Sequence, residues 1–222
     1  MPSLIARLKA DAADEWWAYT THDFVRALGE GTLPPASFRH YLVQDYLFLI
    51  QFARAYALAA YKAPTLASMR KAAAAMTAII DTELKLHIRL VERWGMNEHQ
   101  LETTEEARET VAYTRFVLDA GARGDLLDLT TALAPCVIGY AEIGKVLAAS
   151  ASGRSKSNPY RDWISEYAGD AYQALARDAE TELDRLATES LTEARYPRLL
   201  ALFRRATRLE ADFWQMGLAI AA

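Results

Sequence analysis

Residues 35–62 of the chain read PASFRHYLVQDYLFLIQFARAYALAAYK, and this stretch decides the fold class. Its apolar residues recur at spacings of three and four, which is the period of an α-helix, and it lacks the alternation of a half-buried strand. Asp45 lies in the middle of the apolar face, where a carboxylate without a partner would be strongly destabilising. We therefore expect a partner or a ligand for Asp45. The face consists of Phe38, Tyr41, Phe48, Leu49, Phe52 and Tyr56.

The same helical period continues on both sides of this stretch. Gly31 to Pro35, Pro64 and Gly95 mark breaks between helices. The small, polar segment 150–157 (SASGRSKS) resembles a linker, but it is too short to establish a domain boundary. We predict an all-α fold and a single helical-bundle domain over residues 1–222. The expected helices are 3–20, 22–29, 35–62, 65–94, 104–121, 125–149, 159–167, 169–187 and 192–219.

The bulk composition is that of a packed helical protein, with 52% hydrophobic and 24% charged residues. A formal net charge of −4 without a basic cluster argues against nucleic acid as a partner. The first residues lack the apolar run of a signal peptide, and no apolar stretch reaches the length of a membrane span. We therefore predict a cytoplasmic protein with no membrane partner. The single cysteine, Cys136, cannot form an intramolecular disulfide and is expected to be a free thiol.

Charged residues also interrupt the apolar faces of two other long helices. In the 65–94 helix, Glu83 and His87 lie inside the stripe one turn apart and could pair with each other. In the 192–219 helix, Glu210 is the only charge on the apolar face. Acidic residues are seldom fully buried without a partner, so both carboxylates need an explanation. The apolar stripe of the 65–94 helix consists of Met69, Ala72, Met76, Ile79, Leu90 and Trp94.

The 125–149 helix places Cys136 and Tyr140 on one apolar face. Pro135 precedes the thiol directly, and it should remove one backbone hydrogen bond and distort the helix locally. If the apolar faces of the long helices meet in one bundle, a few polar groups converge in apolar surroundings, as in most small-molecule sites. The expected centre contains Asp45, Glu83, His87, Cys136, Tyr140 and Glu210.

Each of these residues also has a purely structural interpretation. A lone cysteine on an apolar face is more often an inert core residue than a nucleophile. Asp45 and Glu210 could each form a buried salt bridge, for example with Arg54 or Arg208. The residues alone leave these alternatives open.

Three functions are compatible with the same set of residues. A di-iron site would need two Glu-x-x-His pairs and two further Glu residues, whereas the chain offers one Glu83 to His87 spacing of four; haem would need only His22 or His87. A non-catalytic helical binding module would leave the Cys136 thiol inert. Nucleophilic catalysis would use the thiolate with a buried acid as proton shuttle, while Asp45 holds the nitrogen edge of an electron-poor aromatic ring.

Several longer motifs occur together in the sequence. They are DEWW at 14–17, HDFVRALGEGTLPPASFRHYLVQDY at 22–46, Ala134-Pro135-Cys136 followed by Tyr140, Glu142 and Gly144, Trp163-Ile164 with Tyr167, and LEADFWQMG at 209–217. With these motifs the sequence resembles the TenA/thiaminase II family over essentially its full length, in the branch that contains the cysteine.

This resemblance implies that Cys136 is the nucleophile that adds to a pyrimidine ring. It implies that Glu210 protonates the departing amine and activates water. Where many family members have a tyrosine one turn after the aspartate, this chain has Phe48 and so lacks one hydroxyl in the pocket, whereas Glu142 is expected to be structural. The expected substrate-binding residues are Asp45 at the aminopyrimidine edge, Phe48, Tyr113 and Tyr140 around the ring, Tyr167 closing the pocket, and Phe213.

The implied reaction is the hydrolysis of aminomethylpyrimidine to hydroxymethylpyrimidine and ammonia, with slower cleavage of thiamine, in thiamine salvage. The resemblance also implies a haem-oxygenase-like helical bundle and a homotetramer. It implies no metal and no organic cofactor.

Overall fold

The computed structural model describes residues 3–220, and its backbone in this range is helical without any strand. The predicted all-α fold class is therefore confirmed. The elements are α1 (Leu4–Asp11), α2 (Ala13–Thr20), α3 (Asp23–Glu30), α4 (Pro35–Lys62), α5 (Leu66–Ala78), the π-helical turn η1 (Ile79–Glu83), α6 (Leu84–Glu92), α7 (Glu98–Glu102), α8 (Arg108–Arg123), α9 (Leu126–Ala149), α10 (Arg161–Ala168), α11 (Asp170–Ser190) and α12 (Tyr196–Ala219).

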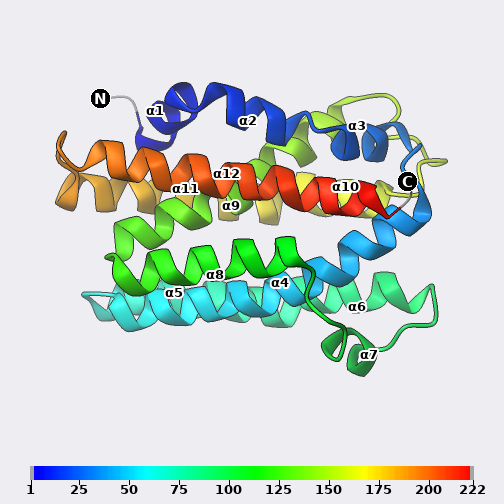
Figure 1. Ribbon diagram of the computed structural model, residues 1–222, viewed down its shortest axis with the longest axis horizontal. Helices are drawn as coiled ribbons and strands as arrows, with labels where there is room; N and C mark the ends of the chain where they lie inside the picture. Colours follow the sequence, from blue (N-terminus) through cyan, green and yellow to red (C-terminus); the bar gives the residue numbers. More distant parts are fainter. Residues whose placement is uncertain (1–2, 221–222) are drawn as a thin grey trace.

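The long helices lie side by side in two groups (Figure 1). One group consists of α4, α5, α6 and α8, the other consists of α9 to α12 with α1 to α3, and α7 stands off at one end. α9 packs against α8, α10, α11 and α12, and α12 packs in addition against α4 and α8. The predicted apolar faces of α4, α9 and α12 therefore meet where the two groups join.

Local side-chain chemistry explains where several helices begin and end. Thr65, Asn97 and Asp125 each form a capping box with the residue three positions later, at the starts of α5, α7 and α9. Gly31 ends α3 in the left-handed conformation, with φ at 77°, which glycine adopts without the strain of a Cβ atom. These signals are all local, so the sequence alone indicates most helix boundaries.

Two predicted boundaries near the surface are wrong. The expected helix over 3–20 is two helices, because Ala12 leaves the helical conformation with φ at −118° and ψ at 34°. This break lets α1 pack against α11 while α2 packs against α12. The expected helix over 104–121 begins only at Arg108 and follows the separate helix α7, since the backbone N–H of Ala107 donates to Gln44 Oε1 at 2.8 Å.

The predicted helix over 65–94 is interrupted by η1, whose π-helical bonds reach back five residues instead of four. Before this turn the predicted stripe is only partly buried, because Ala72 and Met76 pack against the core while Met69 is 42% exposed. The reason is that α5 packs chiefly against α4, at the edge of the bundle. From η1 onward the prediction is right, since Ile79, His87 and Leu90 are buried.

α9 is the central apolar helix of the bundle. Within residues 3–220 it alone has the length and composition of a membrane span, so the prediction that no apolar stretch reaches that length is wrong. Of its apolar window, 67% is buried inside the protein. The helix continues through Pro135, and the Tyr19 hydroxyl donates to the Pro135 carbonyl at 3.3 Å. Gly139 lies directly under the Tyr19 ring, so a small residue is needed there for α2 to approach.

Gly144 allows α9 and α10 to approach closely, and Gly144→Ala should destabilise the protein. A Cβ atom here would lie 2.6 Å from the Tyr167 carbonyl carbon and 2.8 Å from the Ala168 nitrogen, and backbone atoms cannot rotate away. We expect a loss of about 1–3 kcal/mol in the free energy of unfolding, measured by urea denaturation. Gly29→Ala is the control, because its Cβ would meet only the Leu147 side chain. Equal losses in both variants would contradict this interpretation.

Candidate active site

Asp45 has two partners on neighbouring elements of the bundle. It is 4% exposed, and its Oδ2 atom accepts a hydrogen bond from the Tyr41 hydroxyl at 3.0 Å and lies 2.7 Å from His87 Nε2. The alternative salt bridge to Arg54 is wrong, since that guanidinium donates to Gln51. The buried carboxylate is thus held by the imidazole of α6 and a hydroxyl one turn earlier on α4.

His87 is fully buried and has both ring nitrogens engaged. Nδ1 lies 2.9 Å from the backbone carbonyl oxygen of Glu83, and a carbonyl can only accept, so Nδ1 carries a hydrogen. Burial would lower the pKa of His87, but the hydrogen bond and the charge of Asp45 outweigh burial and raise it. Asp45 and His87 therefore form a buried ion pair. The predicted pairing of the Glu83 and His87 side chains is replaced by the contact of His87 with the Glu83 backbone carbonyl.

The Glu83 carboxylate instead accepts a hydrogen bond from the Tyr167 hydroxyl at 3.1 Å. Burial raises the pKa of Glu83 to about 7, and the nearby positive charge of His87 opposes this rise only in part. The π turn η1 carries Glu83, and π turns are frequent at functional sites. Glu83 is thus a carboxyl group that can change its protonation state near neutral pH.

Cys136 of α9 faces Glu210 of α12 inside the bundle. They are 8% and 2% exposed, and each contributes to the pKa shift of the other, so the two side chains lie near each other. The Tyr113 hydroxyl of α8 donates to Glu210 Oε1 at 2.7 Å. The alternative partner Arg208 binds Glu15 instead, so the predicted salt bridge is wrong.

The proton affinities of this pair are strongly shifted. Burial raises the pKa of Glu210 to about 8, although the hydrogen bond from Tyr113 and the nearby Cys136 thiol lower it in part. Burial also raises the pKa of the Cys136 thiol well above its usual range, and the negative charge of Glu210 raises it further. Near pH 7 both groups therefore hold their protons, and the carboxyl group is available as an acid.

Aromatic rings form the walls between the Asp45–His87 pair and the Cys136–Glu210 pair. The Tyr140 ring lies 4.9 Å from the Tyr167 ring, and Phe48 lies 5.0 Å from Tyr113 and 5.8 Å from Phe213, measured between centroids. All side chains predicted to bind the substrate thus gather around one region of the bundle. The region thus brings the Asp45–His87 pair, a thiol and a carboxyl group together among aromatic rings, a combination of groups found in small-molecule sites.

Three features of the site were not predicted from the sequence. The Tyr41 hydroxyl links Asp45 to the Tyr140 hydroxyl, 3.4 Å away, and accepts a hydrogen bond from Trp163 Nε1 at 3.2 Å. Tyr41 lies one turn before Asp45 on the same helical face, and this spacing could have predicted the contact between them. The other two features are the direct contact of His87 with Asp45 and the hydrogen bond between Glu83 and Tyr167. Both join segments that are distant in the sequence, so the spacing of residues within a helix does not predict them.

Two other residues lie outside this region. The Glu142 carboxylate accepts from Trp16 Nε1 at 3.2 Å and pairs with Lys9, which agrees with a structural role. His22 accepts the Phe24 N–H at the start of α3. Within residues 3–220 no group of three His, Cys, Asp or Glu side chains is placed to hold a metal ion. The geometry thus gives the di-iron alternative no support, and His87 has no free ring nitrogen for haem iron.

Comparison with known proteins agrees with the resemblance noted in the sequence. Residues 10–219 match the TENA/THI-4/PQQC family. An aminopyrimidine aminohydrolase of Halalkalibacterium halodurans is 36% identical over 215 residues, covering 97% of this chain and 95% of that protein. A hydroxymethylpyrimidine/phosphomethylpyrimidine kinase of Saccharomyces cerevisiae is 29% identical, and there the match covers 91% of this chain but 37% of that longer protein. The crystal structure of a TenA family transcription regulator from Silicibacter sp. TM1040 has a TM-score of 0.91 and 47% identity, covering 96% of both chains. The chain therefore belongs to the TENA/THI-4/PQQC family.

Proposed function

We propose that the protein hydrolyses aminomethylpyrimidine to hydroxymethylpyrimidine and ammonia in thiamine salvage, and that it cleaves thiamine more slowly. The observation that carries this proposal is the proximity of the Cys136 thiol to the protonatable Glu210 carboxyl group among buried aromatic rings. The similarity to a protein named aminopyrimidine aminohydrolase supports the substrate class. The enzyme would work in the cytoplasm.

The pyrimidine ring would bind between Tyr140 and Phe48, with its amino edge at the Asp45–His87 pair. A carboxylate oxygen accepts a hydrogen bond from an exocyclic amino group, and the contact with His87 holds the Asp45 side chain in place for it. The Tyr41 hydroxyl offers a further polar contact at this edge. Aromatic faces favour a flat ring, so the pocket selects both for shape and for the nitrogen pattern of one edge.

The chemistry would proceed through the thiol and one carboxyl group. Cys136 passes its proton to ionised Glu210 as the sulfur adds to a ring carbon. The C–N bond then breaks, and the nitrogen keeps the electron pair and takes the proton from Glu210, which releases ammonia. Water adds to the exocyclic carbon and gives a proton to Glu210, and the sulfur leaves the ring and recovers that proton. The sum is hydrolysis, with the enzyme unchanged.

The protein would act as a homotetramer. Large apolar side chains are exposed along the end of α4 and the outer side of α5 and η1, and soluble proteins rarely gather such residues without a partner. A contact between copies of the chain would cover them. They are Tyr61, Leu66, Met69 and Ile80.

The direct test is ammonia release from aminomethylpyrimidine by purified protein treated with a chelator. We expect stoichiometric formation of ammonia and hydroxymethylpyrimidine, independent of chelation, because the proposed steps use only side chains. Release that stops on chelation and returns with an added metal would instead support a metal-dependent activity. If no product forms with or without metal, the proposal is wrong, and a binding module becomes the better description.

A further inference from the structure

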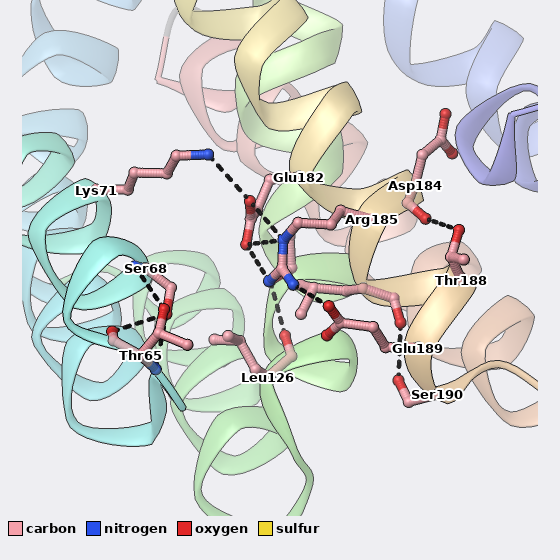
Figure 2. A network of polar contacts seen from close by, with 12 residues as sticks. Thr65, Ser68, Lys71, Leu126, Glu182, Asp184, Arg185, Thr188, Glu189 and Ser190 are labelled. Atoms are coloured by element: carbon pink, nitrogen blue, oxygen red, sulfur yellow. Dashed lines mark hydrogen bonds and ion pairs between the residues drawn. The ribbon is translucent and has the colours of Figure 1, made fainter.

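Polar side chains connect the segment α5–η1–α6 with α10 and α11 at two places on the surface. Lys71 Nζ of α5 lies 3.5 Å from Glu182 Oε2 of α11 (Figure 2). At the end of α6, Arg93 Nη2 lies 2.8 Å from Asp162 Oδ2 of α10. Lys71 and Arg93 are exposed, and ion pairs of exposed side chains contribute little to stability. These two pairs therefore hold the segments together only weakly.

A third connection, between Glu83 of η1 and Tyr167 of α10, lies between two cavities. One cavity, of about 450 Å³, is lined by α5 and α11 before and after these residues in the sequence, together with α9. The other, of about 210 Å³, is lined by the end of α6, the start of α10 and the start of α4. The space on both sides of the connection is thus not filled by packing. The Tyr167 hydroxyl bridges it by donating to Glu83 Oε1 at 3.1 Å.

Other contacts fix the backbone and the ring of Tyr167. The backbone lies against Gly144, and its carbonyl oxygen accepts a hydrogen bond from Gln173 Nε2 at 2.8 Å. The ring centroid lies 4.9 Å from that of Tyr140 and 4.5 Å from that of Trp163. What remains free in Tyr167 is the direction in which its hydroxyl group points the proton.

The protonation state of Glu83 decides that direction. A carboxylate can only accept, so the Tyr167 hydroxyl donates to it, and the lone pairs of the hydroxyl oxygen are left to accept from a bound molecule. A protonated Glu83 can instead donate to this oxygen, which frees the Tyr167 proton and occupies one acceptor position. Because burial raises the pKa of Glu83 to about 7, both states occur near neutral pH.

The groups that face Glu83 come from every element around it. The positive charge of His87 on α6 lowers the pKa of Glu83, whereas the charges of Asp45 on α4 and Glu166 on α10 raise it. Burial raises the pKa of the neighbouring thiol and phenol groups, which therefore keep their protons at neutral pH, so the charge beside the Tyr167 hydroxyl changes there with Glu83. These groups are Tyr56 of α4, Cys136 of α9, Tyr167 of α10 and Tyr172 of α11.

We propose that Glu83 is a positioning residue that acts through Tyr167, and that ionised Glu83 makes the Tyr167 oxygen an acceptor for an N–H group of the bound molecule. This inference rests on the proposed function, whose thiol chemistry leaves Glu83 without a role. An exocyclic amino group has two N–H bonds, and Asp45 would accept from one of them. The Tyr167 ring lies on the same side of the site, because it packs against Tyr140. The Tyr140 hydroxyl lies 3.4 Å from the Tyr41 hydroxyl that binds Asp45.

The test measures the affinity of the intact protein for hydroxymethylpyrimidine by calorimetry at pH 6 and pH 8. The ratio of the affinity at pH 8 to that at pH 6 should be about three- to tenfold larger in the wild type than in Glu83→Gln, which cannot ionise. Tyr167→Phe keeps both the ring and Glu83 but has no hydroxyl, and its ratio should fall by the same factor. If Glu83 only supported the fold, Tyr167→Phe would keep the wild-type ratio.

Asp81→Asn is the matched control, because it also removes a carboxylate from the π turn, but Asp81 is exposed and pairs with Lys85. It should keep the wild-type ratio, and an equal fall in this variant would overturn the inference. An unchanged ratio in Glu83→Gln or in Tyr167→Phe would overturn it as well. Urea denaturation reports on folding, and Tyr167→Phe decides alone if Glu83→Gln does not fold.

Failure of the proposed function is a different result. Wild-type protein would then release no ammonia from aminomethylpyrimidine at either pH. Ammonia release by the wild type together with unchanged affinity ratios in the variants would overturn the role of Glu83 alone.

Discussion

Cys136→Ser should abolish ammonia release from aminomethylpyrimidine, with a fall in kcat of at least about a thousandfold. A serine hydroxyl loses its proton far less readily than a thiol, and it is a weaker nucleophile towards an electron-poor ring carbon. The exchange removes little volume at a buried position, so the fold should persist. Ammonia production under single-turnover conditions, together with urea denaturation of the same preparation, measures both quantities.

Thr130→Ser on the same helix is the matched control, since it also leaves a hydroxyl on α9 but away from Glu210. It should retain wild-type turnover. If the Cys136→Ser variant were fully active, the thiol would not be the nucleophile and the proposed sequence of bond changes would be wrong. If it lost activity only because it unfolded, its denaturation midpoint would fall in parallel.

Glu210→Gln should reduce kcat/KM by about a hundredfold to ten-thousandfold and change its dependence on pH. With a pKa of about 8, Glu210 is largely protonated near pH 7, and the Cys136 thiol is protonated as well. The addition step needs an ionised Glu210, because this carboxylate accepts the proton of the thiol. Wild-type kcat/KM should therefore rise as the pH passes through about 8. The variant should lack this rise, and a variant profile that kept it would assign the ionisation to another group.

The same substitution should stabilise the fold, and more so in alkaline solution. The pKa of Glu210 is about 8 in the folded protein and near the ordinary value of 4.5 in the unfolded chain. Between these values the folded state binds more protons, so the stability associated with this group is present below 4.5 and is lost as the pH rises to about 8. Glutamine cannot ionise, and its advantage should be about 5 kcal/mol at most. Urea denaturation should show a larger gain at pH 9 than at pH 5, and equal gains would contradict the shift.

Helical periodicity alone predicted most of the bundle and which residues lie in the site. It placed Asp45, Cys136, Tyr140 and Glu210 on apolar faces, and all four are buried near one another. This succeeded because a long amphipathic helix has one way to bury its apolar face. The residue that pairs with Asp45 could not be predicted, because a tertiary contact with His87 leaves no trace in the spacing within either helix.

Irregularities of the backbone were the second feature that the sequence did not predict. Nothing in the composition around Ala12 indicates that the chain turns there, since the turn serves the packing of two helices against different partners. The predicted helix over 65–94 failed for a similar reason, because α- and π-type hydrogen bonding suit the same residues at Ile79–Glu83. Their relative stability depends on contacts made elsewhere in the fold.

The π turn makes this segment tolerant of the loss of one residue. In η1 the residue five positions later is bonded over the first, where an α-helix has the residue four positions later, so the turn holds one extra residue without rotating the helix that follows. Asp81 and Thr82 are exposed, so substitutions there should be tolerated. Deletion of either would leave a continuous α-helix with His87 still directed at Asp45, whereas a deletion between Glu83 and His87 that kept the π turn would rotate the imidazole by about 100° away from that carboxylate.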